Sequence, residues 1–214
     1  AGIPNVGAGN NLEEAKRPWY FVANGRKIAF VAATQIERTY NYTKEATDTT
    51  PGVLKTLNPD KYVEVIRQAK KQSDYVIAFV HWGTEGTNYY EADQAELAEK
   101  FVQAGADAVI GGHTHCLQGL TYVGDVPVIY SLGNFWFGST PTDGVNKKDT
   151  AIAQVIINAD GSLGFRFIPC IQENRKTYLV TEESEKQRII TFEQYLSDGV
   201  SIDADGYVTK NNES

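Results

Sequence analysis

All three histidines of this 214-residue chain come shortly after short apolar segments. His81 comes after the run Asp74–Val80, and His113 and His115 come after Asp107–Ile110. Imidazole is a ligand for Zn, Mn, Fe, Co and Ni rather than for Ca or Mg, and it can also transfer protons. A single one of these histidines is as well explained by partial burial. The grouping of all three favours a metal or catalytic site.

The Gly-Gly-His-Thr-His sequence lets the rings of His113 and His115 converge. Residues two apart point to the same side of an extended segment, whereas on a helix they diverge by about 200°. Gly111 and Gly112 allow the backbone to leave a strand tightly and allow an ion to approach the main chain.

The charge of a metal site limits this interpretation. Two divalent ions bring four positive charges, which carboxylates normally offset, and neutral imidazoles offset none. Glu85 is the nearest acidic residue in the sequence, and we expect it to face solvent at the rim of the site. The other carboxylates are expected from polypeptide upstream of this sequence.

Three further residues near the histidines have two interpretations each. Trp82 is expected to pack in the core rather than to stack on substrate. Asn134 either supplies its amide to the rim or only turns the chain. Gln118 is expected to form local hydrogen bonds rather than to bind a metal.

A predicted strand-helix-strand unit positions the histidines. The strands are Asp74–Val80 and Asp107–Ile110, and the helix between them begins at Asp93 with Glu96 in a capping box and ends at Gly105. The right-handed crossover rule makes the strands parallel, so their carboxyl ends lie at the same edge of the sheet, where α/β proteins bind ligands. The predicted class is α/β.

Other elements follow from apolar periodicity and turn residues. They are a strand at Lys27–Ala33, a polar excursion at Thr34–Thr50, a helix that starts at Asn58-Pro59, a strand at Val126–Tyr130, an antiparallel hairpin of Ala151–Asn158 and Leu163–Ile171, and a helix at Glu185–Leu196. We expect one domain over residues 1–198 and a polar C-terminal tail over 199–214 that is mobile at its end.

Composition excludes several classes of protein. With 42% hydrophobic and 22% charged residues the chain should fold, and its apolar runs are far shorter than the roughly 20 residues of a membrane-spanning helix. A net charge of -7 without long basic runs argues against nucleic acid as a partner. Cys116 and Cys170 are expected to be free buried thiols. The absence of Met indicates that upstream polypeptide is missing.

Several motifs together resemble the bacterial capsule synthesis CapA family. They are His81-Trp82-Gly83-Thr84-Glu85, Gln94 with Ala104-Gly105-Ala106-Asp107, Gly112-His113-Thr114-His115 with Gln118, and Tyr130-Ser131-Leu132-Gly133-Asn134-Phe135. The resemblance covers at least Val76–Phe137 and implies that the chain is a C-terminal portion of such a protein.

This resemblance implies a calcineurin-like metallophosphoesterase fold, an αββα sandwich that is incomplete here, with a parallel βαβ core and an antiparallel C-terminal hairpin. It implies a site for two divalent ions, Mn, Zn or Fe, in which His81 and His113 hold one ion and His115 the other, all three acting as catalytic residues. The upstream Asp, Asp and Asn-His motifs of that superfamily have no counterpart before His81, so ligands outside this fragment would complete the site.

The implied function is synthesis or export of an anionic surface polymer such as poly-γ-glutamate. Expected partners are the upstream N-terminal portion of the same protein, membrane capsule-synthase subunits and the polymer, at the cell surface or another extracytoplasmic location, with an anchor in the upstream portion. The alternatives are a metal-dependent phosphoesterase of unknown substrate, a non-catalytic assembly component, and a sugar- or peptide-binding module that uses Trp82 and Trp136.

Overall fold

The computed structural model describes residues 2–35, 43–138 and 148–211. It divides the chain into two compact units, which are described separately below. The first unit comprises Ala1–Gly83 and Ala92–Val109, and the second comprises Thr84–Glu91 and Ile110–Ser214. The single domain expected over residues 1–198 stays a prediction.

A parallel strand pair forms the centre of the first unit. The elements of this unit are β1 (Ala8–Gly9), α1 (Leu12–Lys16), β2 (Trp19–Ala23), β3 (Arg26–Thr34), β4 (Gly52–Val53), α2 (Asp60–Lys70), β5 (Tyr75–His81), α3 (Ala92–Ala104) and the start of β6 (Ala108–Gly112). β3 pairs in parallel with β5 and antiparallel with β2. The chain is therefore a mixed α/β protein with a parallel core, as predicted.

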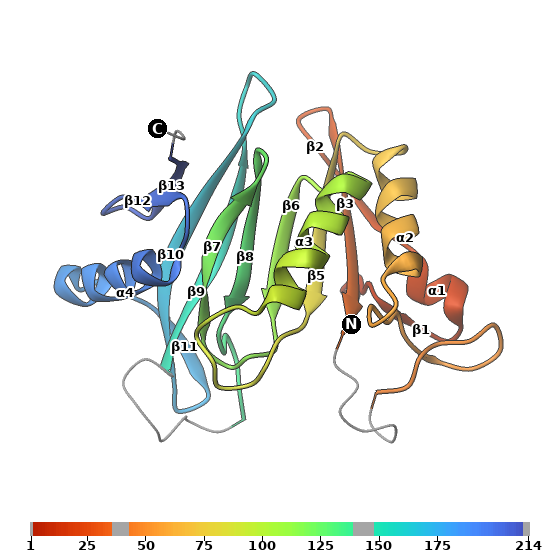
Figure 1. Cartoon of the computed structure of the whole chain (residues 1–214), viewed down its shortest axis with the longest axis horizontal. Coiled ribbons are helices and arrows are strands. Elements are labelled where there is room, and N and C mark those ends of the chain that lie inside the picture. Colours follow the sequence, from red (N-terminus) through yellow and green to blue (C-terminus); the bar gives the residue numbers. More distant parts are fainter. Residues whose placement is uncertain (1, 36–42, 139–147, 212–214) are drawn as a thin grey trace. The chain divides into compact units, whose positions relative to one another are not determined.

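The buried side of α2 explains why this helix packs on β3 and β5 (Figure 1). Tyr62, Val65, Ile66 and Ala69 recur at helical spacing, and all four are buried. The Tyr62 hydroxyl donates to the carbonyl oxygen of Phe79 at 2.8 Å, which satisfies a polar group that would otherwise be costly in the core. Burial raises the pKa of this phenol.

The start of α3 differs from the sequence prediction. The helix begins at Ala92, so Asp93 lies in its first turn and does not cap it. The Asp93 carboxylate instead accepts a hydrogen bond from Gln35 at 2.7 Å. It also accepts one from the backbone amide of Gln94 at 2.9 Å, whereas the spacing to Glu96 suggested a capping box.

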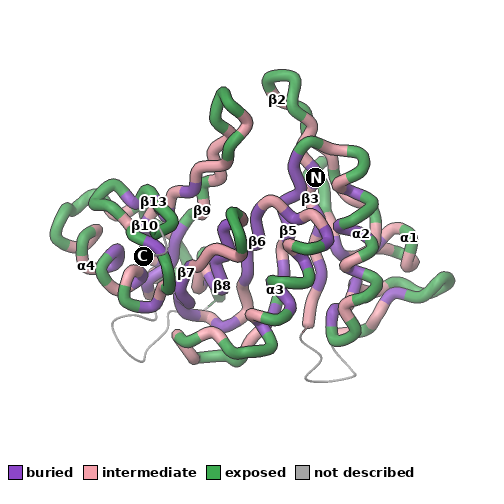
Figure 2. The backbone as a smooth tube through the Cα atoms, turned by 45° about the horizontal axis from the view of Figure 1, so that its top comes forward, coloured by how far each residue is buried: buried purple, intermediate pink, exposed green. Residues whose placement is uncertain are grey.

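Antiparallel strands dominate the second unit. Its elements are the end of β6, β7 (Leu117–Val123), β8 (Val126–Leu132), β9 (Asp149–Ile157), β10 (Leu163–Glu173), β11 (Lys176–Leu179), α4 (Glu183–Leu196), β12 (Val200–Ile202) and β13 (Tyr207–Lys210). The predicted hairpin is confirmed as β9 and β10, with Leu163 opposite Ile157. In Figure 2 the buried colour runs along parts of the strands, whereas many turns are exposed.

The expected polar tail of residues 199–214 carries regular structure. β12 and β13 form a hairpin, and β13 pairs with β10 through Phe165 and Val208. Val200 and Val208 are buried, and Gly206 turns the chain with φ 86°. The Asp-Ala-Asp-Gly turn between two short alternating segments is the sequence signal for this hairpin. The overall polarity of the tail concealed that signal. The last three residues lie outside the described part of the chain.

Close packing and an ion pair hold α4 in the second unit. A Cβ atom on Gly119 of β7 would lie 1.9 Å from the carbonyl oxygen of Leu196, so only glycine allows α4 to end there. Arg188 of α4 donates two hydrogen bonds, at 2.7 and 2.9 Å, to the carboxylate of Asp149, whose side chain is 1% exposed. The helix is thus tied to the start of β9.

Both cysteines are free and buried, which confirms the prediction for Cys116 and Cys170. Among the described residues, no helix is long and apolar enough to cross a membrane.

Replacing Arg188 by Met should lower the free energy of unfolding by about 3 kcal/mol. This is the lower end of the range for breaking a buried pair, because the Arg188 side chain is 31% exposed. Urea unfolding of Arg188→Met, Asp149→Asn and the double variant would measure it. We expect the double variant to lose less than the sum of the single losses, and strict additivity would show that the pair contributes nothing specific.

Glu193 of α4 is fully buried, and neither of its carboxyl oxygens has a hydrogen-bond partner among the residues described. Burial raises its pKa well above the ordinary 4.5. The folded state therefore keeps a proton that the unfolded chain releases above about pH 4.5, so this group makes the protein less stable as pH rises.

The substitution Glu193→Gln should remove this pH dependence. Unfolding free energies at pH 5, 7 and 8 should show Glu193→Gln gaining on the wild type as pH increases, whatever its effect at pH 5. Glu183→Gln, on an exposed position of the same helix, is the control. A difference between wild type and Glu193→Gln that is constant with pH would contradict the buried neutral carboxyl.

Candidate metal centre

Three side chains of the second unit form a cluster with the composition of a metal site. One potential ligand atom from each of Glu85, His113 and His115 lies within 4.8 Å of the other two. The two imidazole rings are 5.9 Å apart, and Glu85 Oε1 is 3.7 Å from His113 Nε2. The convergence predicted for residues two apart is therefore present in the structure.

The backbone of both histidines adopts an unusual conformation. His113 immediately follows β6 and has φ 109°, and His115 has φ 62°. Such conformations cost residues other than glycine on the order of 1–3 kcal/mol each, and they concentrate at functional sites. Between the histidines, Thr114 is fully buried and its hydroxyl donates to the carbonyl oxygen of Cys116 at 2.9 Å. The turn thus buries its middle residue while both rings converge.

The segment Thr84–Glu91 holds the histidine turn in place through hydrogen bonds. The Gly86 amide donates to the carbonyl oxygen of Thr114, and the Asn88 side chain donates to that of Leu117, both at 2.8 Å. The buried Gln118 amide donates at 3.1 Å to two carbonyl oxygens of the segment. Gln118 is therefore a hydrogen-bonding residue, as the sequence suggested, but its partners are 29 and 31 residues away rather than local. These bonds also place Glu85 beside His113.

Asn134 fixes the orientation of the His115 ring. Its Oδ1 lies 2.7 Å from His115 Nδ1, and its Nδ2 faces the His115 carbonyl oxygen at 3.5 Å. A carbonyl-type oxygen can only accept, so Nδ1 carries the proton and Nε2 is left as the metal-binding atom. Hydrogen bonds of this kind orient the histidine ligands of most metal sites. Asn134 follows β8 and is 8% exposed.

The geometry of the cluster fits a divalent ion. Histidine and carboxylate ligands lie about 2.0–2.2 Å from Zn, so two ligands of one ion are at most about 4.2–4.4 Å apart. The separations in the cluster are all within 4.8 Å, which is about half an ångström above this limit at most, and the 3.7 Å between Glu85 and His113 lies within it. The Glu85 side chain is 45% exposed and can rotate by that amount, whereas the His113 side chain is 5% exposed and is held.

The remaining predicted residues lie in the first unit. His81 is the last residue of β5, as expected, and its side chain is exposed; its role in the same centre stays a prediction. Trp82 is fully buried and stacks on Phe101 with ring centroids 6.2 Å apart. The indole is thus a core residue, which corrects its alternative placement at a substrate-binding rim.

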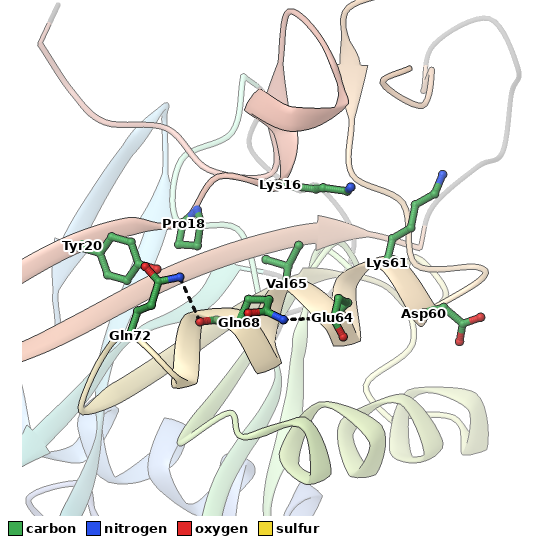
Figure 3. A pocket seen from close by; sticks show the side chains of 9 residues that line it. All are labelled: Lys16, Pro18, Tyr20, Asp60, Lys61, Glu64, Val65, Gln68 and Gln72. Atoms are coloured by element: carbon green, nitrogen blue, oxygen red, sulfur yellow. Dashed lines mark hydrogen bonds between the residues drawn. The ribbon is translucent and has the colours of Figure 1, made fainter. Parts of the chain in front are cut away.

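A separate cavity of about 460 Å³ lies in the first unit, between the start of β2 and α2 (Figure 3). Pro18, Tyr20 and Val65 supply its apolar surface, and Lys16 and Lys61 lie over it. Lys61 pairs with Glu45 at 2.5 Å. None of the histidines lines this cavity, so we do not include it in the candidate centre.

Glu85 contributes more to the cluster than its place in the sequence indicates. The residue is exposed, as expected, but its carboxylate also lies beside His113 and contributes negative charge to the cluster. The hydrogen bonds that place it are donated by the Gly86 amide and by the Gln118 side chain, and they join segments about 30 residues apart. The His-Trp-Gly-Thr-Glu sequence gives only the spacing of Glu85 from His81. It does not indicate that the segment Thr84–Glu91 folds against the histidine turn.

The family that this chain matches and its curated relatives agree with each other. Residues 1–139 match the family described as bacterial capsule synthesis protein PGA_cap. The chain is 33% identical to the PGA biosynthesis protein CapA of Bacillus subtilis over 186 residues, which are 86% of this chain and 47% of that protein. It is 32% identical to the capsule biosynthesis protein CapA of Bacillus anthracis over 193 residues, 88% of this chain and 45% of that protein.

The chain thus spans about half the length of these curated relatives. Among solved structures, a putative 5'-nucleotidase from Staphylococcus aureus is similar with a TM-score of 0.48 and 13% identity, over 89% of this chain and 36% of that one. The match over residues 1–139 and the identity to both CapA proteins decide the family. The chain belongs to the bacterial capsule synthesis protein family PGA_cap.

Proposed function

We propose that this chain is the metal-binding portion of a capsule biosynthesis protein, which takes part in the synthesis or export of an anionic surface polymer such as poly-γ-glutamate. The observation that carries the proposal is the Glu85–His113–His115 cluster in a chain of this family. The names of the two Bacillus relatives support the polymer, and the strained histidine turn supports a role beyond folding.

Each residue of the cluster has a distinct task in this proposal. Asn134 keeps the proton of His115 on Nδ1, so that Nε2 faces the site. Glu85 supplies the negative charge that neutral imidazoles lack. A bound divalent ion would neutralise an anionic group of the ligand and lower the pKa of bound water. His113, held at low exposure, is placed to bind the ion or to transfer a proton.

We further propose that His81 and carboxylates from the upstream portion complete a centre for two ions. One carboxylate in the cluster cannot offset the four positive charges of two divalent ions. At a net charge of -7 the chain repels an anionic polymer as a whole. Contact with the polymer is therefore local, through bound metal and a few basic side chains.

The whole protein is proposed to act at the cell surface or in another extracytoplasmic location, with its anchor in the upstream portion and with membrane capsule-synthase subunits as partners. Hydrolysis of a phosphoester and a non-catalytic role in assembly are the two forms that the metal-dependent function can take. An assay of bis(p-nitrophenyl) phosphate with Mn²⁺ or Zn²⁺ separates them, provided that the protein includes the upstream portion. Turnover that is lost in the His113→Ala/His115→Ala variant supports the hydrolase, and no turnover with either ion supports the assembly role.

The cluster should bind one divalent ion in this chain alone. Calorimetric titration with Mn²⁺ and with Zn²⁺ should show a single site, and His113→Ala or His115→Ala should abolish it. Glu85→Gln should weaken it, because the charge is lost while the shape is kept. Glu96→Gln, on an exposed position of α3, is the control. Unchanged affinity in both histidine variants would refute the metal centre.

Asn134→Leu should weaken metal binding by roughly 10- to 100-fold without unfolding the chain, because the His115 ring loses the group that orients it. The same titration measures the affinity, and circular dichroism checks the fold. Asn134→Asp, which keeps an acceptor at this position, should retain the affinity. An Asn134→Leu variant that binds metal as the wild type does would show that this hydrogen bond is only structural.

A further inference from the structure

Three consecutive aromatic side chains lie exposed beside the metal cluster. Phe135, Trp136 and Phe137 follow Asn134, and they are 49%, 69% and 40% exposed. The Phe137 ring is 4.8 Å from the ring of His115. Large aromatic side chains are usually buried, so three in sequence at the edge of a candidate site indicate a surface that meets a ligand.

The backbone of this aromatic segment is held, although its side chains are exposed. The hydroxyl of Thr177 in β11 donates a hydrogen bond to the carbonyl oxygen of Phe135. The side-chain amide of Gln172 in β10 donates one to the carbonyl oxygen of Phe137 at 3.4 Å. Arg175, in the turn between these strands, donates to the carbonyl oxygen of Gly138 at 2.8 Å. One hairpin thus fixes the main chain, which reduces the entropy lost when the rings hold a ligand.

The same hairpin places positive charge next to the aromatic segment. Asn174 and Arg175 both have positive φ, as in a tight two-residue turn, and Arg175 and Lys176 are exposed there. Lys148 is paired with Glu173 at 2.5 Å. In a chain of net charge -7, exposed basic residues beside exposed rings suit a ligand that is both anionic and flat.

We propose that Phe135, Trp136 and Phe137 form a stacking platform for a planar ring in an anionic ligand whose charged group lies at the Glu85–His113–His115 cluster. This inference rests on the hydrolase form of the proposed function, in which the ligand is a phosphoester, because poly-γ-glutamate carries no planar ring. It adds that the second unit selects ligands that carry a ring next to the anion. Trp136, the most exposed of the three, provides the main stacking face, and Arg175 adds attraction for the anion.

The test uses phenyl phosphate and methyl phosphate as probes with the 214-residue chain in the presence of Mn²⁺. Calorimetry should show that the wild type binds phenyl phosphate roughly 2- to 10-fold more tightly than methyl phosphate, the range for one aromatic contact. Trp136→Ala should remove this preference and leave methyl phosphate binding unchanged. Trp19→Ala, which removes a partly exposed indole of the first unit, should keep the preference.

The outcomes separate this inference from the proposed function. Equal binding of both esters by the wild type, no binding of either, or a preference that survives in Trp136→Ala would overturn the platform. A ring preference that is lost in Trp136→Ala supports the platform. If the histidine variants still bind Mn²⁺ in that case, the metal centre is refuted and the platform is not. Loss of Mn²⁺ binding in the histidine variants without any ring preference supports the centre and refutes the platform.

Discussion

The candidate centre depends on a short turn in which two histidines are held in backbone conformations that such residues disfavour. His113 and His115 both have positive φ, which two non-glycine residues adopt only where the surroundings impose it. Hydrogen bonds from Gly86 and Asn88, together with the burial of Thr114, supply that constraint. A relaxed extended turn would release Thr114 from its buried position. Folding free energy thus offsets the strain of the convergent pair.

This arrangement also explains why the polar residues near the turn have different roles. The side chains of Gln118 and Asn88 donate to backbone carbonyl oxygens and so hold the backbone in place. Asn134 bonds the His115 ring and so affects its chemistry. Glu85, which is half-exposed, is the member of the cluster that can move toward an ion. Rigid imidazoles and one mobile carboxylate suit a site that must admit ligands.

The sequence predicts those parts of the fold that local periodicity controls. The stripe from Tyr62 to Ala69 predicts α2 because it reflects one buried face of a helix, and the apolar run before His81 predicts β5 because that strand is buried on both faces. The start of α3 at Ala92 and the β12–β13 hairpin were not predicted. The Gln35 side chain, 58 residues away, donates a hydrogen bond to Asp93, and β10 pairs with β13 in an otherwise polar segment. Residue type and spacing thus predicted the histidine pair, whereas only the folded chain brought Glu85 to it.

Charge gives the strongest reason to connect this chain with a longer protein. Within the described residues the cluster offers one carboxylate, enough to offset half the charge of a single divalent ion. A centre of two divalent ions would carry four positive charges, and Glu85 offsets only one of them. The curated relatives are about twice as long as the matched region. A second ion at this centre would therefore need carboxylates beyond the one that the cluster offers.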